Sequence, residues 1–184
     1  MLKIIYIIRF IPIMLFVNWH SKELLLDLKK WKKVLKISGN NRLVLATLLC
    51  RYPEFRNLFI YRNRFRRIYR YWIKLWYKPM NTLFIEAKEI GGGLFIQHGF
   101  STMISAEKIG ENCWINQQVT IGYKDNTRAP IIGDNVTITC GAKVLGNIQI
   151  GDNSVIGANA VVVKNVECNS TMVGIPAHKI DRKV

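Results

Sequence analysis

Aliphatic residues recur at every sixth position in the second half of this 184-residue chain, and this period constrains the fold most strongly. The two runs are Ile109, Ile115, Ile121, and then Ile132, Ile138, Val144, Ile150, Ile156, Val162. Each six-residue unit predicts one flat strand and one tight corner, and three units close a triangular coil of about 18 residues. We expect a parallel β-helix of about four to five coils.

One interruption breaks this repeat between Ile121 and Ile132, which are eleven residues apart. The intervening residues 123–130 are polar and rich in turn formers, so we expect them to leave the coil as a loop. A β-helix needs no such loop for stability, whereas loops on rigid scaffolds often carry binding sites. The loop is therefore a candidate part of a functional site.

The first part of the chain has a helical pattern. Apolar side chains at helical spacing predict helices over residues 22–36, 42–51 and 54–77, with turn formers or proline at their ends. We therefore expect an α+β chain in two parts. A basic, aromatic-rich helical region occupies residues 1–80, and a β-helix domain with a short C-terminal tail occupies residues 81–184.

Positive charge is concentrated in the helical region. The sequence has 27 Lys and Arg against 12 Asp and Glu, and residues 1–80 hold the entire excess of +15. Between residues 56 and 78, cations alternate with aromatic side chains and no acid occurs. This composition suits an anionic membrane surface. A solvated helix with an aromatic core face is the alternative, and we expect no nucleic-acid partner.

Residues 1–17 are strongly apolar, but Lys3, Arg9 and Pro12 interrupt them. A membrane-spanning helix needs about 20 mostly apolar residues, so we expect a helix that lies on a membrane or packs in the core. The four cysteines form no CxxC pair, which disfavours a zinc cluster and suits reduced thiols. The sequence predicts a cytoplasmic protein without metal, peripheral on the inner face of the cytoplasmic membrane.

Five motifs carry a resemblance to a known family. They are residues 90–98 (IGGGLFIQH), 116–122 (NQQVTIG), 141–148 (GAKVLGNI), 157–162 (GANAVV) and 173–177 (VGIPA). With them the chain resembles the left-handed β-helix acyltransferases, in particular the serine acetyltransferase-type branch, which includes bacterial capsule and exopolysaccharide O-acetyltransferases. The resemblance covers residues 85–178 well and the helices loosely. It implies a left-handed β-helix, acetyl-CoA as co-substrate, and a homotrimer with active sites between subunits.

His98 is the candidate general base. Acetyl transfer to a hydroxyl needs a base, and an imidazole suits that role near neutral pH. The resemblance places the family's catalytic histidine at this position. Serine acetyltransferases have an Asp fifteen residues earlier, where this chain has Leu83. We expect Glu86 to orient His98, with Glu89 or a backbone carbonyl as alternatives.

Two further departures from the family concern the acceptor. The Asp that precedes the histidine is Gln97 here, and the Arg-His pair of the loop corresponds to Arg128 and Ala129. Amide side chains suit a neutral sugar hydroxyl, and Gln97, Asn116 and Gln117 supply them. We expect these three residues and Arg128 to bind the substrate; hydrogen bonding within the corners is the alternative for the amides.

The resemblance also places the acetyl-CoA groove along small or corner residues, with lysines beside the CoA phosphates. The residues are Gly122, Tyr123, Cys140, Gly141 and Ala158 for the pantetheine arm, and Lys143, Lys164 and Lys179 for the phosphates. For each lysine, simple solvation is an equal alternative.

We therefore predict an acetyl-CoA-dependent O-acetyltransferase that acts on a sugar hydroxyl of a bacterial surface polysaccharide or its lipid-linked precursor. Serine O-acetyltransferase is the first alternative, and a non-catalytic membrane-associated scaffold is the second. A γ-class carbonic anhydrase would need a three-His zinc site, which one histidine in the coils does not supply.

Overall fold

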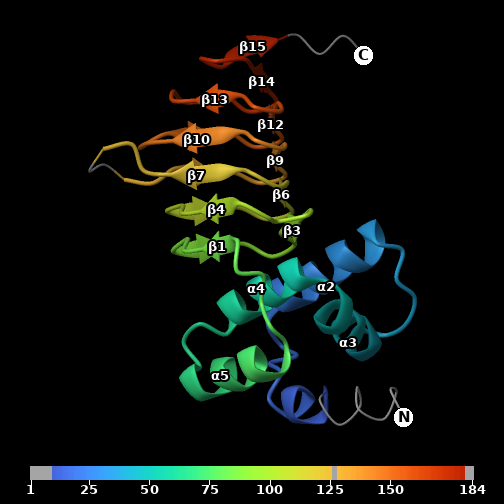
Figure 1. The fold of residues 1–184 in the computed structure, drawn as a ribbon. Helices are drawn as coiled ribbons and strands as arrows, with labels where there is room; N and C mark the ends of the chain where they lie inside the picture. Colours follow the sequence, from blue (N-terminus) through green and yellow to red (C-terminus); the bar gives the residue numbers. More distant parts are fainter. Residues whose placement is uncertain (1–9, 126–127, 181–184) are drawn as a thin grey trace.

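The computed structural model, which describes residues 10–125 and 128–180, is a column of β-coils above a group of helices (Figure 1). The helices are α2 (Lys22–Val34), α3 (Asn41–Arg51), α4 (Pro53–Arg62) and α5 (Arg67–Trp76), and residues 10–15 are helical as well. None of the helices in these described ranges is long and apolar enough to cross a membrane.

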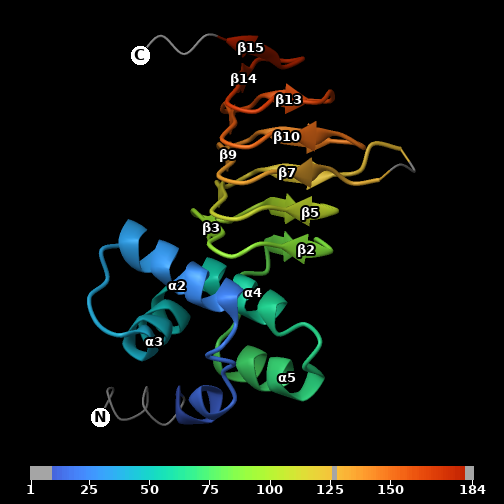
Figure 2. The same cartoon turned by 180° about the vertical axis from the view of Figure 1, so that it is seen from behind.

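The strands form three faces, seen from opposite sides in Figures 1 and 2. Face A contains β1 (Leu83–Ile85), β4 (Thr102–Ile104), β7 (Thr120–Gly122), β10 (Lys143–Leu145) and β13 (Val161–Val162). Face B contains β2 (Glu89–Ile90), β5 (Lys108–Ile109), β8 (Ile131–Ile132) and β11 (Gln149–Ile150). Face C contains β3 (Phe95–Ile96), β6 (Trp114–Ile115), β9 (Thr137–Ile138), β12 (Val155–Ile156) and β14 (Thr171–Val173), with β15 (His178–Ile180) antiparallel to β14.

The six-residue repeat produces this column directly. The chain visits faces A, B and C in turn, and the nine repeating aliphatic residues point inward with at most 2% of their surface exposed. Burial of these stacked side chains drives the fold. The predicted loop leaves the column between β7 and β8 (Figure 1). The predicted fold class, helices followed by a left-handed β-helix with one extruded loop, is confirmed.

The prediction of one helix over residues 54–77 is wrong, because α4 ends at Arg62 and α5 begins at Arg67. Asn63 causes the break. Its side-chain amide donates to the carbonyl oxygen of Phe59 at 2.9 Å, which satisfies a carbonyl group at the end of α4. The chain then turns, so that α4 packs against β1 while α5 lies farther from the coils (Figure 1).

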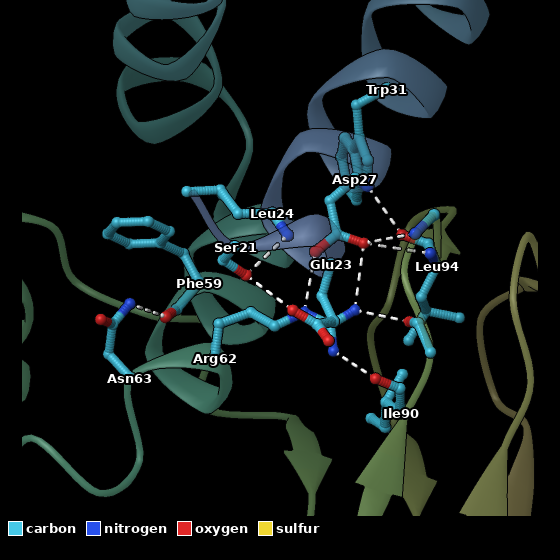
Figure 3. A network of polar contacts seen from close by, with 12 residues as sticks. Ser21, Glu23, Leu24, Asp27, Trp31, Phe59, Arg62, Asn63, Ile90 and Leu94 are labelled. Carbon is cyan, nitrogen blue, oxygen red and sulfur yellow. Dashed lines mark hydrogen bonds and ion pairs between the residues drawn. The ribbon is translucent and has the colours of Figure 1, made fainter. Parts of the chain in front are cut away.

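A buried ion pair joins the helices to the first coil (Figure 3). The Asp27 carboxylate on α2 is 1% exposed and accepts hydrogen bonds from Arg62 Nε at 2.8 Å and from the Gly93 N–H at 2.7 Å. Arg62 also donates to the carbonyl oxygens of Ile90 and Gly91. Burial raises the pKa of Asp27, while the Arg62 charge and these donors oppose that rise. The pair therefore ties α2, α4 and the first coil together.

Aromatic packing continues through the same junction. Trp31 is 1% exposed, and its Nε1 donates to the Leu94 carbonyl oxygen at 2.8 Å. Its ring centroid lies 4.6 Å from that of Phe95, which lies 4.6 Å from that of Trp114. The helices and the coils thus share one continuous core, and the division into two parts at residue 80 stays a prediction.

The prediction for residues 1–17 is covered only in part, because residues 1–9 lie outside the described residues. In the helical stretch 10–15, Ile13 is fully buried, and its carbonyl oxygen accepts a hydrogen bond from the Tyr69 hydroxyl at 2.8 Å. Ile11 and Leu15 are 51% and 75% exposed. One side of this stretch packs against α5, and the other side faces solvent.

Candidate active site

His98 lies at the corner between faces C and A of the first coil, directly after β3. Its side chain is exposed, and its backbone has a φ of +63°. The same left-handed conformation recurs at other corners of the coils, for example at Gln118, Asn153 and Asn159. What the structure adds at His98 is that the imidazole is accessible from outside the coil.

The corner that carries His98 is longer than those above it. The buried residues that flank it, Ile96 and Ile104, are eight positions apart, whereas the regular repeat has six. The extra residues leave the ladder, and Gly99, with a φ of +34°, lets the chain return to face A. This break in the period is a sequence signal that marks the corner independently of the histidine.

Gln97 is held beside His98 by two donors. Its Oε1 accepts from Trp114 Nε1 at 3.2 Å and lies 3.5 Å from Asn116 Nδ2, which turns its Nε2 toward His98 Nε2 at 3.5 Å. The amide group can donate to an unprotonated Nε2, so a substrate hydroxyl would have to displace Gln97 before this nitrogen could accept its proton. Two of the predicted substrate residues, Gln97 and Asn116, are thus gathered around His98.

Four further predicted residues lie along the same edge. The pairing of β3, β6, β9 and β12 places Gln117, Cys140, Gly141 and Ala158 at the C-to-A corners of successive coils above His98. The Gln117 Oε1 atom is buried and has no hydrogen-bond partner among the residues that the structure describes. A buried acceptor without a partner is costly, which makes Gln117 a candidate to meet a ligand or a second subunit.

The two predicted acids lie elsewhere. Glu86 follows β1 at the corner between faces A and B, where its Oε2 lies 3.5 Å from Ser105 Oγ and it lines a cavity of about 510 Å³ beside α4 and α5. Glu89 begins β2 on face B. Within the described residues, neither acid has a recorded contact with His98. The orienting role of Glu86 therefore stays a prediction that no contact within the chain supports.

Glu54, in the first turn of α4, is an acid that the sequence patterns did not single out. A Cβ placed on Gly99 would lie 2.8 Å from Cγ of Glu54 and 3.1 Å from Cδ2 of Leu83, so both side chains flank the residue after His98. The Glu54 side chain is half-buried and forms no recorded hydrogen bond or ion pair with another residue in the described ranges. Sequence spacing could not reveal it, because Glu54 comes from the helices and His98 from the coils.

The loop-side candidates lie at the other edge of face A. Gly122 ends β7, and a Cβ placed on it would meet no atom within 4 Å. Tyr123 begins the loop with 56% of its surface exposed, and Lys164 is exposed just after β13. The residues predicted for one acetyl-CoA groove are therefore divided between two edges of a single chain.

The two other predicted phosphate lysines have partners within the chain. Lys143 Nζ donates to the carbonyl oxygen of Gln118 at 2.7 Å, beside the edge of His98. Lys179 on β15 lies 3.0 Å from Glu167 Oε2 in an exposed ion pair. Exposed pairs of this kind contribute little to stability, so Lys179 can exchange Glu167 for a phosphate at low cost.

Arg128 is exposed near the end of the loop, close to Glu107. The pKa of Glu107 is lowered mainly by the hydrogen bond from Lys88, whose Nζ lies 2.6 Å from Glu107 Oε2, and also by the Arg128 charge. The Arg128 guanidinium thus has an acidic neighbour within its own chain.

The cysteines Cys113 and Cys140 both lie in the coils. Cys113 is buried in the coil interior, and burial raises the pKa of its thiol to about 12, so it stays protonated. Cys140 is half-buried at the edge that carries His98. In the described part of the chain, no three or more His, Cys, Asp or Glu side chains are grouped so as to hold a metal ion.

The fold and this edge define a class of protein, a parallel β-helix of hexapeptide repeats with an exposed histidine on a lengthened corner. Residues 129–164 match the family described as "Bacterial transferase hexapeptide (six repeats)". The match falls on the coils that follow the loop.

Among curated proteins, the chain is similar to serine acetyltransferases. The enzyme of Staphylococcus aureus (strain Mu50 / ATCC 700699) is 51% identical over 94 residues, which are 49% of this chain and 44% of that protein. The enzyme of Synechococcus elongatus is 45% identical over 97 residues, 50% of this chain and 40% of that protein. The chain thus matches less than half the length of these relatives.

Solved serine acetyltransferases have the same fold over most of this chain. The Neisseria gonorrhoeae enzyme in complex with serine has a TM-score of 0.66 at 28% identity and covers 88% of this chain and 69% of its own. A serine acetyltransferase in complex with CoA has a TM-score of 0.66 at 26% identity, covering 85% and 68%. The resemblance to hexapeptide-repeat acyltransferases of the serine acetyltransferase branch is therefore confirmed, and it extends into the helices.

Proposed function

We propose that this chain is an acetyl-CoA-dependent O-acetyltransferase. The observation that carries the proposal is the exposed imidazole of His98 on its lengthened corner, at the foot of an edge lined by small and amide residues. The similarity of about half the chain to serine acetyltransferases supports it, as does a relative solved with CoA.

In this proposal His98 accepts the proton of the acceptor hydroxyl as the oxygen attacks the thioester carbonyl carbon. The carbon–sulfur bond breaks, and the departing CoA thiolate takes up the proton from His98. A positioned general base contributes about 10²- to 10⁴-fold to such a reaction. Acetyl-CoA is the co-substrate, and no acyl-enzyme is needed, so Cys140 serves as a wall residue.

L-Serine is the acceptor that the comparisons favour. The relatives named above are serine acetyltransferases, and one was solved with serine bound. They give no support to the polysaccharide hydroxyl that the sequence departures favoured. Arg128 is the candidate partner for the serine carboxylate, because a guanidinium binds carboxylates with two parallel hydrogen bonds.

A neutral sugar hydroxyl of a surface polysaccharide is the second candidate. The specific observation in its favour is that amides surround His98: Gln97 contacts its ring, and Asn116 and Gln117 lie on the next coil. The ammonium group of serine would gain more from a carboxylate than from these neutral amides, so the amides favour an uncharged acceptor. An assay with both kinds of acceptor distinguishes the two candidates.

The proposal includes a homotrimer. Gly122, Tyr123 and Lys164 lie at one edge of face A, and His98 and Gln97 lie at the other. Three copies around an axis parallel to the column would bring the loop edge of one protomer against the His98 edge of the next. A groove between subunits would then contain both sets of residues. A cytoplasmic location remains part of the proposal, in keeping with four free thiols.

The test measures CoA release from acetyl-CoA with L-serine and, separately, with a panel of neutral sugars. We expect His98→Ala to lower turnover about 10²- to 10⁴-fold while leaving thermal unfolding unchanged, because the side chain is exposed. Turnover retained by His98→Ala would contradict the assigned base. Absence of CoA release by the wild-type chain with every acceptor would favour a non-catalytic scaffold.

A further inference from the structure

Helix α5 has a second apolar face that no other element of the described ranges, residues 10–125 and 128–180, covers. Tyr69 and Ile73 point inward and are buried. Ile68 lies three and four residues before Tyr71 and Trp72, which lie four and three residues before Leu75, and the four side chains are 78%, 66%, 44% and 58% exposed in chain order. A helix that packs on one side alone needs one apolar stripe, so the outer stripe requires a separate explanation.

The neighbouring helical stretch extends this stripe. Phe16 lies with its ring centroid 6.0 Å from that of Tyr69, and Phe16 itself is 57% exposed. Phe16, Phe65, Ile68 and Trp72 line a hollow of about 810 Å³ on the same surface. Both views place α5 and this stretch together at the end of the molecule away from the C-terminal coils (Figures 1 and 2). The result is one continuous apolar patch at the base of the column.

Cations line the patch. Arg66 and Arg67 line the hollow together with the apolar side chains. Arg70 and Lys74 lie on another side of α5, where they line the cavity that Glu86 also lines. Neither Arg66 nor Arg67 forms an ion pair with an acid in the described ranges. Unneutralised cations around exposed aromatic and aliphatic side chains are the pattern of helices that lie in a membrane interface.

We propose that this patch, made of residues 10–16, Phe65 and α5, docks the protein on an anionic lipid bilayer. The apolar stripe enters the interface, and the flanking cations meet anionic headgroups. The exposed aliphatic side chains argue against nucleic acid, whose surface offers phosphates and stacking bases to aromatic rings. In the trimer proposed above, three patches would face the same way, and binding through several patches strengthens attachment.

The test is co-sedimentation of the full chain with vesicles of phosphatidylcholine, with and without about one quarter phosphatidylglycerol. We expect binding to the anionic vesicles at low salt, with weakening at high salt because exposed charges are screened. The variant Ile68→Ser/Trp72→Ser should bind about tenfold more weakly or worse, since it removes apolar area from the stripe. Its matched control is Leu25→Ser/Leu43→Ser, which removes exposed apolar side chains from α2 and α3, 37% and 55% exposed, away from both the patch and face A, and should bind as the wild type does.

Three results would overturn the proposal. The wild-type chain would fail to sediment with anionic vesicles at low salt, or both double variants would bind equally well, or a DNA duplex would bind the wild type as tightly as the vesicles do. If the patch joins two copies instead, Ile68→Ser/Trp72→Ser would lower the oligomeric state in sedimentation velocity without affecting vesicle binding. CoA release is measured in parallel without vesicles, so failure of docking is distinguishable from failure of the proposed activity.

Discussion

At the scale of single residues, the position of His98 on its corner supports its proposed role as general base. A histidine in the repeat region is visible in the sequence, and the resemblance gave it a role. The structure adds the accessibility of the imidazole, the lengthened corner and the Gln97 amide at its ring. The acid was harder to predict. Glu86 and Glu89 are near in sequence but lie on other parts of the coil, whereas Glu54 reaches the corner from α4.

A test of Glu54 separates these acids. If its carboxylate orients and electrostatically supports His98, Glu54→Gln should lower kcat/KM by about tenfold or more. Glu86→Gln is the matched control and should leave kcat/KM unchanged. A loss of kcat/KM in Glu86→Gln but not in Glu54→Gln would restore the prediction made from the sequence.

At the scale of the elements, two ion pairs lie at the junction between the helices and the coils, and they differ in burial. Asp27 and Arg62 are almost fully enclosed, whereas Lys22 on α2 reaches Glu111 at 2.6 Å with 72% and 39% of the two side chains exposed. Amphipathic spacing predicted α2 well, and the turn formers before residue 41 and Pro53 after residue 51 delimited α3. These signals missed the break at Asn63, where a side-chain hydrogen bond ends α4 inside a segment without proline or glycine.

The buried pair should dominate the stability of this junction. We expect Arg62→Met to lower the free energy of unfolding by roughly 3–5 kcal/mol, because Asp27 is left buried without its counter-charge. Lys22→Met is the control for the exposed pair and should cost about 0–1 kcal/mol. Urea unfolding of both variants measures the difference. Equal losses would show that the buried Asp27 pair contributes no more to the free energy of unfolding than the exposed pair does.

The same variant should acquire a characteristic dependence on pH. Without Arg62, burial holds the pKa of Asp27 above its unfolded value, so its ionisation opposes folding at neutral pH. Protonation removes this opposition, and the stability deficit of Arg62→Met relative to the wild type should therefore shrink as pH falls from 7 toward 5. A deficit that stays constant over this interval would show that water or another cation reaches Asp27 in the variant.

At the scale of the whole molecule, the sequence predicted the column but not what surrounds it. A strict six-residue period is enough to specify coils, because each unit repeats the same inward contact. Nothing in that period says how the helices attach, since the junction depends on contacts between residues far apart in sequence, such as Trp31 with Leu94. The period also does not predict the proposed trimer, in which residues from the two edges of face A would meet in one groove between neighbouring protomers.

Subunit mixing tests that implied neighbour directly. Gly122 has room for a side chain within its own chain, so Gly122→Leu should fold while obstructing the proposed groove, and His98→Ala should lack the base. If each active site combines the His98 edge of one protomer with the loop edge of the next, mixed trimers recover some sites in which both edges are intact. Unfolding the two inactive variants together and refolding them at equal concentration should then restore about one quarter of wild-type activity. Each variant refolded alone should remain inactive, and a mixture that is equally inactive would place both edges in a site formed by a single chain.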